Sequence, residues 1–567
     1  MGVHRFAPVA TALARSLVIL CAICCAPALA ENGQARFEVP ISNKVASGPL
    51  TGRLIVVVGT RESPEPRMTI GLTGPAMFGV DIEQLPPGQP AVVDATADAY
   101  PMESLSELPA GEYFVQAVLI RYGKVRRSDG HEIWVPTEHR RLNSMPFHAL
   151  PGNLYSGLQK ATLDPARGFS LRLELTEVIP QPEEPKDTEW LRHTSIKSRL
   201  LSEFWGRPMY LRATALVPRG YDEHPNVRYP AIYAQSQERT SPFYFDPDPA
   251  SHERQLGLKD GNVQTGYEFY QTWKSDDFPR FVVIVIEQSS PYFLEAYSVD
   301  SANNGPYGRA IVEELIPRLE KKFRLIPHAY ARLLEGASTG GWESLALQLK
   351  YPDFFGGAWI FNPDPIDFRH YGLVNIYRDE NMFSVPLSKF TSVERPFRRT
   401  VEGQVTHTLR DLARLEAVMG SKGRSGYQLD AWQSVHGPVG PDGYPVLLFD
   451  KRTGVINREV AEYMRENGYD LTEYTRHNWP TLGPKLIGKL NFFSGEMDNF
   501  YLNLAVYDFQ AMLAETRDPH YPGRFEYGRP KKGHNWHLTD FSEMIREMAE
   551  HVHRNAPPGE DTSQWRY

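Results

Sequence analysis

A serine between glycines is the first feature of this sequence that could do chemistry. The segment LLEGASTGGWESLALQL, residues 333–349, contains G-x-S-x-G with Gly336, Ser338 and Gly340. An apolar run typical of a strand precedes the motif, and an amphipathic helical pattern follows it. A strand that enters a helix through this motif exposes the serine hydroxyl at the tip of a strained turn. An ordinary tight turn is the alternative, but this context favours Ser338 as a nucleophile.

A serine hydroxyl needs a base, and the base needs an acid to orient it. Catalytic groups of open α/β sheets gather beyond the carboxyl ends of strands, and the order along the chain is serine, acid, histidine. The apolar pattern KLIGKLNFF, residues 485–493, predicts a strand and is followed by SGEMDNFY. Asp498 is therefore the predicted acid, with Glu496 as the alternative.

The predicted base lies in a loop before the last helical pattern. His534 follows Gly533 there, and His537 is the alternative. The helix that starts at Thr339 aims its first N–H groups and the positive end of its dipole at the serine. An anionic intermediate would be stabilised at that place.

Strands alternating with helices surround these residues, which predicts the α/β class. Apolar strand patterns cover residues 230–234, 281–286 and 357–361, and helical stripes cover 311–323 and 541–552. This part follows a proline-rich, acidic linker, PQPEEPKDTEW.

The segment before the linker is predicted to be β-rich. Strand patterns cover residues 53–58 and 112–120, and FSLRLELT, residues 169–176, alternates apolar and polar side chains. No long helical period interrupts them. We expect an N-terminal β-sandwich of immunoglobulin-like type over residues 31–185, followed by a catalytic α/β domain over 186–567.

The first thirty residues form a predicted secretory signal peptide. Arg5 and Arg15 precede and flank an apolar run, and Ala28-Leu29-Ala30 is a small-residue cleavage site. The run is shorter than the roughly 20 residues that span a bilayer. We therefore expect cleavage after Ala30, a secreted or periplasmic protein, and no membrane span in its mature form. All three cysteines, Cys21, Cys24 and Cys25, fall in this segment, so the mature chain would have no disulfide.

The charge balance argues against a nucleic-acid partner. The formal net charge is −8 at pH 7, 23% of the residues are charged, and no long basic run occurs. The proposed chemistry needs no metal and no cofactor.

Four segments, in order, resemble the esterase D-like branch of the α/β-hydrolases. They are residues 207–233, 304–324, 336–358, and the pair SGEMDNFYL and KKGHNWH. The resemblance covers about residues 200–550. It implies an α/β-hydrolase fold, Ser338, Asp498 and His534 as the triad, and the backbone N–H of Thr339 as one oxyanion donor.

The chain departs from that family in two places. Family members tend to have a His-Gly turn after the third strand, where this chain has YAQSQERTSPF, so the backbones of Gln235 and Ser236 are the expected second donors. An insertion over about residues 363–480 separates the serine from the acid. It is expected either to form a cap over a substrate cleft or to pack on the sheet as a subdomain.

The sequence thus predicts an exported serine hydrolase that cleaves carboxylic esters through an acyl-enzyme. Its substrate would be a small-molecule or polymer-linked ester. An acyltransferase shares the first half-reaction and stays open. A catalytically inactive binding protein on the same scaffold is the third possibility.

Overall fold

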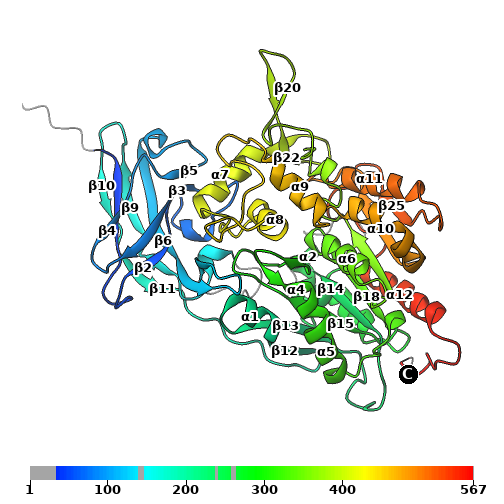
Figure 1. Ribbon diagram of the computed structural model, residues 1–567. Coiled ribbons are helices and arrows are strands. Elements are labelled where there is room, and N and C mark those ends of the chain that lie inside the picture. Colours follow the sequence, from blue (N-terminus) through cyan, green and yellow to red (C-terminus); the bar gives the residue numbers. More distant parts are fainter. Residues whose placement is uncertain (1–33, 138–145, 236–240, 257–263, 566) are drawn as a thin grey trace, which may run out of the picture.

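The computed structural model describes residues 34–137, 146–235, 241–256, 264–565 and 567. The predicted signal peptide, residues 1–30, and Ser236 lie outside the described residues. Figure 1 shows N-terminal strands at one end, a sheet with helices at the other, and a helical segment lying against both.

An eight-stranded sheet forms the centre of the second half. Its order is β12-β13-β15-β14-β18-β19-β24-β25; β12 and β13 run antiparallel to their neighbours, and the others are parallel. The middle strands are apolar and buried because helices cover both faces. The strands are β12 (Leu191–Ser198), β13 (Met209–Leu216), β14 (Ala231–Gln235), β15 (Val282–Glu287), β18 (Arg332–Ala337), β19 (Gly357–Phe361), β24 (Leu490–Gly495) and β25 (Arg524–Gly528).

Helices connect these strands, as the alternating pattern predicted. A π-helical turn, Ala310–Leu315, joins α4 to α5 in the segment where one helical stripe was predicted. A short pair, β16 (Asp300–Ser301) and β17 (Gly305–Pro306), precedes it. The helices are α1 (Arg199–Trp205), α2 (Pro249–Leu256), α3 (Gly266–Trp273), α4 (Tyr307–Arg309), α5 (Ile316–Lys322), α6 (Thr339–Lys350), α11 (Asn503–Ala514) and α12 (Phe541–Asn555).

The N-terminal region is β-rich and consists of two sheets. Phe37 and Val39 of the smaller sheet share a buried core with Leu54 and Val56 of the larger one. The immunoglobulin-like type stays a prediction. The small sheet holds β1 (Arg36–Pro40), β4 (Pro90–Val93) and β10 (Ser170–Arg172); the large one holds β2 (Leu50–Gly59), β3 (Ala76–Leu85), β5 (Asp98–Tyr100), β6 (Gly111–Arg126), β7 (Glu132–Pro136), β8 (Leu154–Ser156), β9 (Gln159–Leu163) and β11 (Leu175–Val178).

Two predicted strands differ from those observed. Residues 169–176 divide between β10 and β11, which belong to different sheets, although Leu173 and Leu175 are buried as the alternation required. The chain passes from one sheet to the other there, and Leu173 and Leu175 both point into the core that the two sheets share. The strand predicted to start at residue 485 starts at Leu490, because α10 continues to Leu486.

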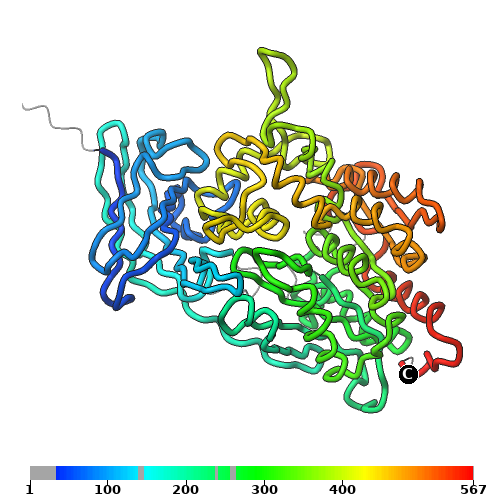
Figure 2. The backbone as a smooth tube through the Cα atoms, in the orientation of Figure 1, coloured from blue at the N-terminus to red at the C-terminus, as the bar shows by residue number. Residues whose placement is uncertain are grey.

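The long segment between β19 and β24 holds two hairpins and four helices. The β20–β21 hairpin projects from the molecule, α7 lies beside the N-terminal strands, and α10 lies beside α11 (Figures 1 and 2). The hairpins are β20 (Ser384–Pro386) with β21 (Ser392–Glu394) and β22 (Pro396–Arg399) with β23 (Val405–Thr408); the helices are α7 (Leu409–Met419), α8 (Gln428–His436), α9 (Arg458–Glu466) and α10 (Leu471–Leu486).

A buried arginine joins the N-terminal region to α7. Arg53 of β2 is 2% exposed, and its guanidinium donates to the carbonyl oxygens of Val418 at 2.9 Å and Ala417 at 2.7 Å. It also contacts Asp81 at 3.2 Å and Asp98 at 2.7 Å. A cation at the C-terminal end of a helix is favourable because the carbonyls there have no partner within the helix. The contact fixes α7 against the N-terminal sheet.

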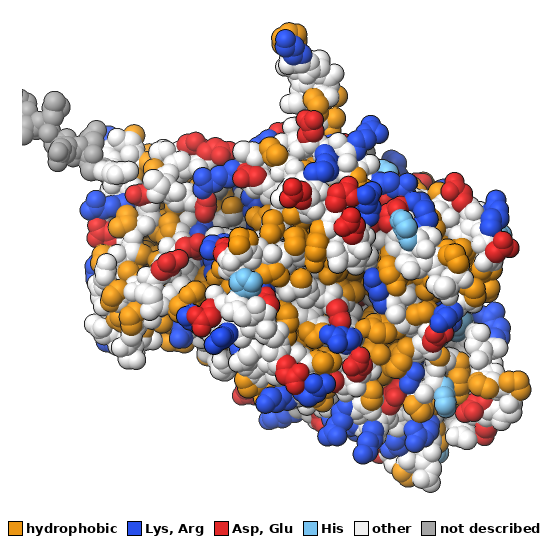
Figure 3. All heavy atoms as spheres, in the orientation of Figure 1, with side chains coloured by type: hydrophobic (Ala, Val, Ile, Leu, Met, Phe, Trp, Pro, Cys, Tyr) orange, Lys and Arg blue, Asp and Glu red, His pale blue; other side chains and the backbone are white. Residues whose placement is uncertain are grey.

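The visible surface mixes charges of both signs. In Figure 3, Lys and Arg side chains are interspersed with Asp and Glu over this face. Among the described residues, no helix combines the length and apolar character needed to cross a membrane.

Candidate active site

Ser338 occupies a strained turn between β18 and α6. Its φ of 57° and ψ of −122° lie outside the regions that residues with a side chain favour. Its N–H donates to the carbonyl of Phe361 in the neighbouring strand at 3.0 Å. A Cβ at Gly336 would lie 2.2 Å from the carbonyl oxygen of Gly340, so strand and helix could not come this close with any other residue there. The glycines therefore serve the turn as the motif predicted.

Asp498 and His534 come together at the same edge of the sheet. Asp498 follows β24 and His534 lies in the loop after β25, and Asp498 Oδ2 is 2.6 Å from His534 Nδ1. The aspartate side chain is 0% exposed and the histidine 14%. The backbone N–H groups of Phe500 and Leu502 donate to Asp498 Oδ1 at 2.8 and 3.2 Å. The carboxylate is thereby fixed, and it holds the imidazole through Nδ1.

The loop around the acid also holds the histidine from its backbone side. The Asn499 side-chain oxygen accepts the N–H of His534 at 2.9 Å. The Phe500 ring meets the His534 ring edge to face, with centroids 5.0 Å apart. Backbone and ring are each restrained by residues adjacent to Asp498, so the acid segment positions the histidine as a unit.

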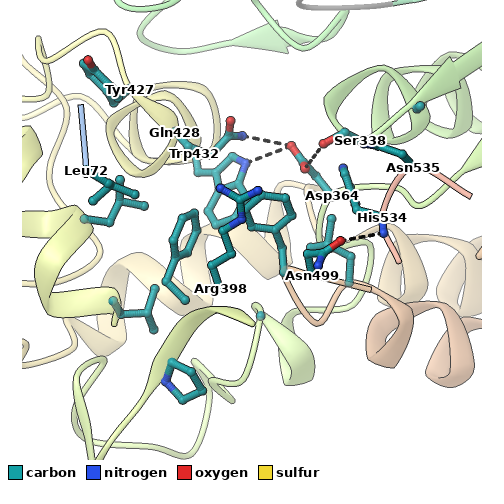
Figure 4. Close-up of a pocket in the computed structure, with 18 of the residues that line it drawn as sticks. Leu72, Ser338, Asp364, Arg398, Tyr427, Gln428, Trp432, Asn499, His534 and Asn535 are labelled. Atoms are coloured by element: carbon teal, nitrogen blue, oxygen red, sulfur yellow. Dashed lines mark hydrogen bonds between the residues drawn. The ribbon is translucent and has the colours of Figure 1, made fainter. Parts of the chain in front are cut away.

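Ser338 and His534 open into one cavity of about 960 Å³. Figure 4 shows both at one side of it, with Leu72 across from them. This opposite wall comes from outside the eight-stranded sheet: Leu72 belongs to the N-terminal region, and Leu409 and Leu412 to α7. Besides Leu409 and Leu412, the long segment contributes Asp364, Tyr371, Gly372, Leu373, Met382, Pro396, Phe397, Arg398, Tyr427, Gln428 and Trp432 to the lining.

A second carboxyl group, absent from the sequence-based site, lies beside Ser338. Asp364 follows β19, the strand next to that of the serine, and is 4% exposed. Its Oδ1 accepts the Ser338 hydroxyl at 3.4 Å, a long and therefore weak hydrogen bond. Its Oδ2 accepts from the Tyr297 hydroxyl at 2.7 Å, the Thr339 hydroxyl at 2.9 Å, the Gln428 amide at 3.0 Å and the Trp432 indole at 3.3 Å.

Burial raises the pKa of Asp364, although its hydrogen bonds oppose that shift. Burial also raises the pKa of Glu343 well above its usual value, and the charge of Asp364 adds to the effect. A neutral Asp364 would not repel negative charge that develops near Ser338. Its position directly after a strand at the carboxyl edge is the signal by which the sequence could have revealed it.

The two alternative residues occupy different surroundings. Glu496 accepts the N–H of Lys531 at 2.9 Å and lies 3.4 Å from Arg529, and its side chain is 31% exposed. It is not among the described residues that line the cavity. His537 does line the cavity, where its ring packs against Phe361 with centroids 4.6 Å apart. The acid and histidine that the structure pairs are thus Asp498 and His534, as predicted, and not Glu496 or His537.

Two of the three predicted oxyanion donors, Thr339 and Gln235, are among the described residues, and both lie near the serine. Thr339 is the first residue of α6, so its backbone N–H belongs to the N-terminal end of the helix, next to Ser338. Gln235 ends β14 next to Gly336, and its side-chain oxygen accepts the Ser298 hydroxyl at 3.1 Å. Ser236 lies outside the described residues. The described residues include no cluster of three or more His, Cys, Asp or Glu suited to a metal ion.

Several solved structures of esterases and serine hydrolases are similar to this chain at low identity. A ferulic acid esterase is 12% identical, with 64% of this chain and 97% of that chain covered and a TM-score of 0.34. An S-formylglutathione hydrolase from Agrobacterium tumefaciens is 11% identical, with 66% and 99% covered and a TM-score of 0.32. No curated protein matches the sequence closely enough to count as a relative. These similarities assign no substrate to the chain.

A family model gives the more direct comparison. The family described as "Putative esterase" matches residues 206–367, a range that includes β14, β18, Ser338, α6 and Asp364. The matched range holds the elbow, and the described acid and histidine segments follow it in the order that the motifs required. Residues 206–367 of the chain thus match the esterase family, in agreement with the esterase resemblance that the motifs indicated.

Proposed function

We propose that this protein hydrolyses carboxylic esters through an acyl-enzyme on Ser338, with His534 as base and Asp498 as the acid that orients it. One observation carries the proposal. The strained serine and a histidine held at 2.6 Å by a fully buried aspartate open into the same cavity.

In the first half-reaction, His534 bears its proton on Nδ1, facing Asp498, so Nε2 carries no hydrogen and can accept the serine proton. The Ser338 hydroxyl turns from its weak bond to Asp364 and gives its proton to Nε2 as Oγ attacks the ester carbonyl carbon. The N-terminus of α6 stabilises the oxyanion. The tetrahedral intermediate then expels the alcohol, which takes the proton back from Nε2.

Water completes the reaction. His534 Nε2 removes a proton from the water molecule as its oxygen attacks the acyl carbon on Ser338. Collapse of the second tetrahedral intermediate breaks the bond to Oγ, which regains the proton. The acid is released and the enzyme returns to its starting state.

Ser338→Ala tests the proposal. We expect kcat/KM for 4-nitrophenyl butyrate to fall by at least about 10³-fold while the circular dichroism spectrum is unchanged. Ser344→Ala is the matched control, because Ser344 lies on the same helix, is buried, and does not line the cavity. Wild-type hydrolysis by Ser338→Ala would contradict the mechanism.

The proposal includes export and a division of the chain at about residue 185. The basic start, apolar run and Ala28-Leu29-Ala30 support cleavage after Ala30. N-terminal sequencing of protein secreted from a bacterial host should then begin at Glu31. Protein that retains Met1 in every fraction would contradict export.

A further inference from the structure

Arg398 is the only lysine or arginine among the described residues that line the cavity. It lies on β22, whose hairpin partner β23 places His407 opposite it. The Thr406 hydroxyl donates to its carbonyl at 3.2 Å, so the strand is anchored. In Figure 4 its side chain extends between Leu72 and Ser338. Strand β22 thus presents an exposed cation to the cavity.

The cation lies one aromatic ring away from the predicted base. The Arg398 guanidinium carbon is 5.5 Å from the centroid of the Phe500 ring, and Phe500 contacts His534. A group paired with Arg398 could therefore belong to the same small molecule as an ester at Ser338.

Neighbouring arginines bind carboxylate or carbonyl oxygens, whereas Arg398 contacts the Phe500 ring and, within the described residues, pairs with no carboxylate. Arg395 pairs with Asp379 at 2.6 Å. Arg399 donates to the carbonyl of Asp498 at 3.0 Å and lies over the Tyr501 ring. Within the described part of the chain, no carboxylate oxygen lies within 4.0 Å of the Arg398 guanidinium.

The one acid among the described lining residues does not form an ion pair with Arg398. Among the described lining residues, Asp364 alone is an aspartate or glutamate, and its Oδ2 already accepts four hydrogen bonds from protein groups. The charge of Arg398 is thus left for a ligand. A guanidinium fork matches the two oxygens of a carboxylate.

We infer that the substrate is an ester that carries a carboxylate, which Arg398 binds while the ester lies at Ser338. The ester group in this inference rests on the proposed function, whereas the carboxylate rests on the position of Arg398 in the cavity wall. The apolar wall of Leu72, Leu409 and Leu412 accommodates the hydrocarbon that joins the two groups.

Binding to the Ser338→Ala protein tests the charge without turnover. The probes are monobenzyl adipate, which is anionic, and benzyl methyl adipate, its neutral counterpart, measured by isothermal titration calorimetry. We expect the anionic ester to bind about two- to fivefold more tightly, because Arg398 is an exposed residue and an ion pair at an exposed site is weak. The preference should shrink as salt is raised.

Two further substitutions in that background locate the preference. Arg398→Gln should abolish it, and Arg398→Lys should retain part of it. Lys389→Gln is the matched control, because Lys389 is an exposed cation on the β20–β21 hairpin of the same segment and does not line the cavity. Equal binding of the two esters, an unchanged preference in Arg398→Gln, or no binding of either ester would overturn the inference.

Hydrolysis by the wild-type protein separates the inference from the proposed function. Cleavage of benzyl methyl adipate without any preference for the anionic ester contradicts only the role of Arg398. Tight, Arg398-dependent binding without cleavage of either ester contradicts only the proposed hydrolysis.

Discussion

The two sides of the cavity are built in different ways. Ser338, Asp498 and His534 each follow a strand of one sheet within a short loop, so backbone hydrogen bonds between β18, β24 and β25 and their neighbours set where they lie. The opposite side combines Leu72 with α7, from segments far apart in the chain. Side-chain contacts such as those of Arg53 hold that side together.

This difference separates chemistry from selectivity. The edge of a sheet holds reacting atoms in fixed positions because the strands that carry them are rigid and hydrogen-bonded into one sheet. A wall made by contact between two segments can change shape with little effect on the sheet. Substitutions on the sheet side should therefore abolish turnover, whereas those on the opposite side should alter stability and the choice of substrate.

The largest effect is expected from Asp498→Asn on the sheet side. An amide there disturbs the tautomer and orientation of His534, so kcat should fall by about 10³- to 10⁴-fold. Steady-state kinetics with 4-nitrophenyl butyrate measures it. Glu496→Gln, in the same loop, is the control and should stay within about threefold of wild type. If Glu496→Gln were the more damaging substitution, the assignment of the acid would be wrong.

Arg53→Ala should weaken the contact between the N-terminal region and α7. It removes two hydrogen bonds to the end of α7 and leaves Asp81 and Asp98 without this partner, so the free energy of unfolding should fall by about 2–4 kcal/mol. Urea denaturation measures it. Arg36→Ala, which breaks an exposed pair with Glu38, should cost less than about 1 kcal/mol. Equal losses would mean that the Arg53 contact does not hold the wall.

Leu72→Ala tests whether the N-terminal region contacts substrate. The Tyr100 hydroxyl donates to the Leu72 carbonyl at 2.7 Å, so the backbone should stay in place while the side chain is lost. The ratio of kcat/KM for 4-nitrophenyl octanoate to that for the acetate should fall by about three- to tenfold. Met68→Ala changes an exposed methionine outside the cavity wall and should leave the ratio as it is. An unchanged ratio in Leu72→Ala would remove this region from the substrate site.

The smallest effect concerns a buried acid of the long segment. Burial, and then the charge of Asp367, raises the pKa of Asp470 to about 7. Since its folded-state pKa exceeds the unfolded value of about 4, its contribution to stability is lost as pH rises from about 4 through 7.

Asp470→Asn keeps the cap of α10 but has no such charge to bury. It should reduce the drop in Tm between pH 5 and pH 8 by about 1–3 °C relative to wild type. Asp222→Asn, at an exposed site, should leave that drop unaltered. Thermal scans at the two pH values decide, and a drop as large in Asp470→Asn as in wild type would refute this assignment.

The sequence predicted the sheet side far better than the opposite side. Ser338, Asp498 and His534 lie in short stretches whose spacing follows strand, turn and helix signals, and Asp498 and His534 do come together. Asp364 was missed because its motif, FNPDP, looks like an ordinary turn, although the strand predicted over residues 357–361 places it at the carboxyl edge of the sheet. Arg398 was missed because its place in the cavity wall depends on packing between distant segments, which no local pattern encodes.

The fold class of each region was predictable from the sequence, but the contacts between distant segments were not. Alternating apolar residues predicted the β-rich start and the α/β remainder, because each pattern depends on local periodicity. The contact of Arg53 with Val418 links residues hundreds of positions apart, and no local pattern encodes it. The division of residues 169–176 between two sheets likewise depends on the partners that each half finds.

Labelling with a serine-directed fluorophosphonate, followed by peptide mapping, tests the central claim most directly. The account predicts one labelled peptide that contains Ser338, with labelling lost in His534→Ala because the hydroxyl is no longer activated. Label on another serine, or label on Ser338 that is undiminished in His534→Ala, would contradict it.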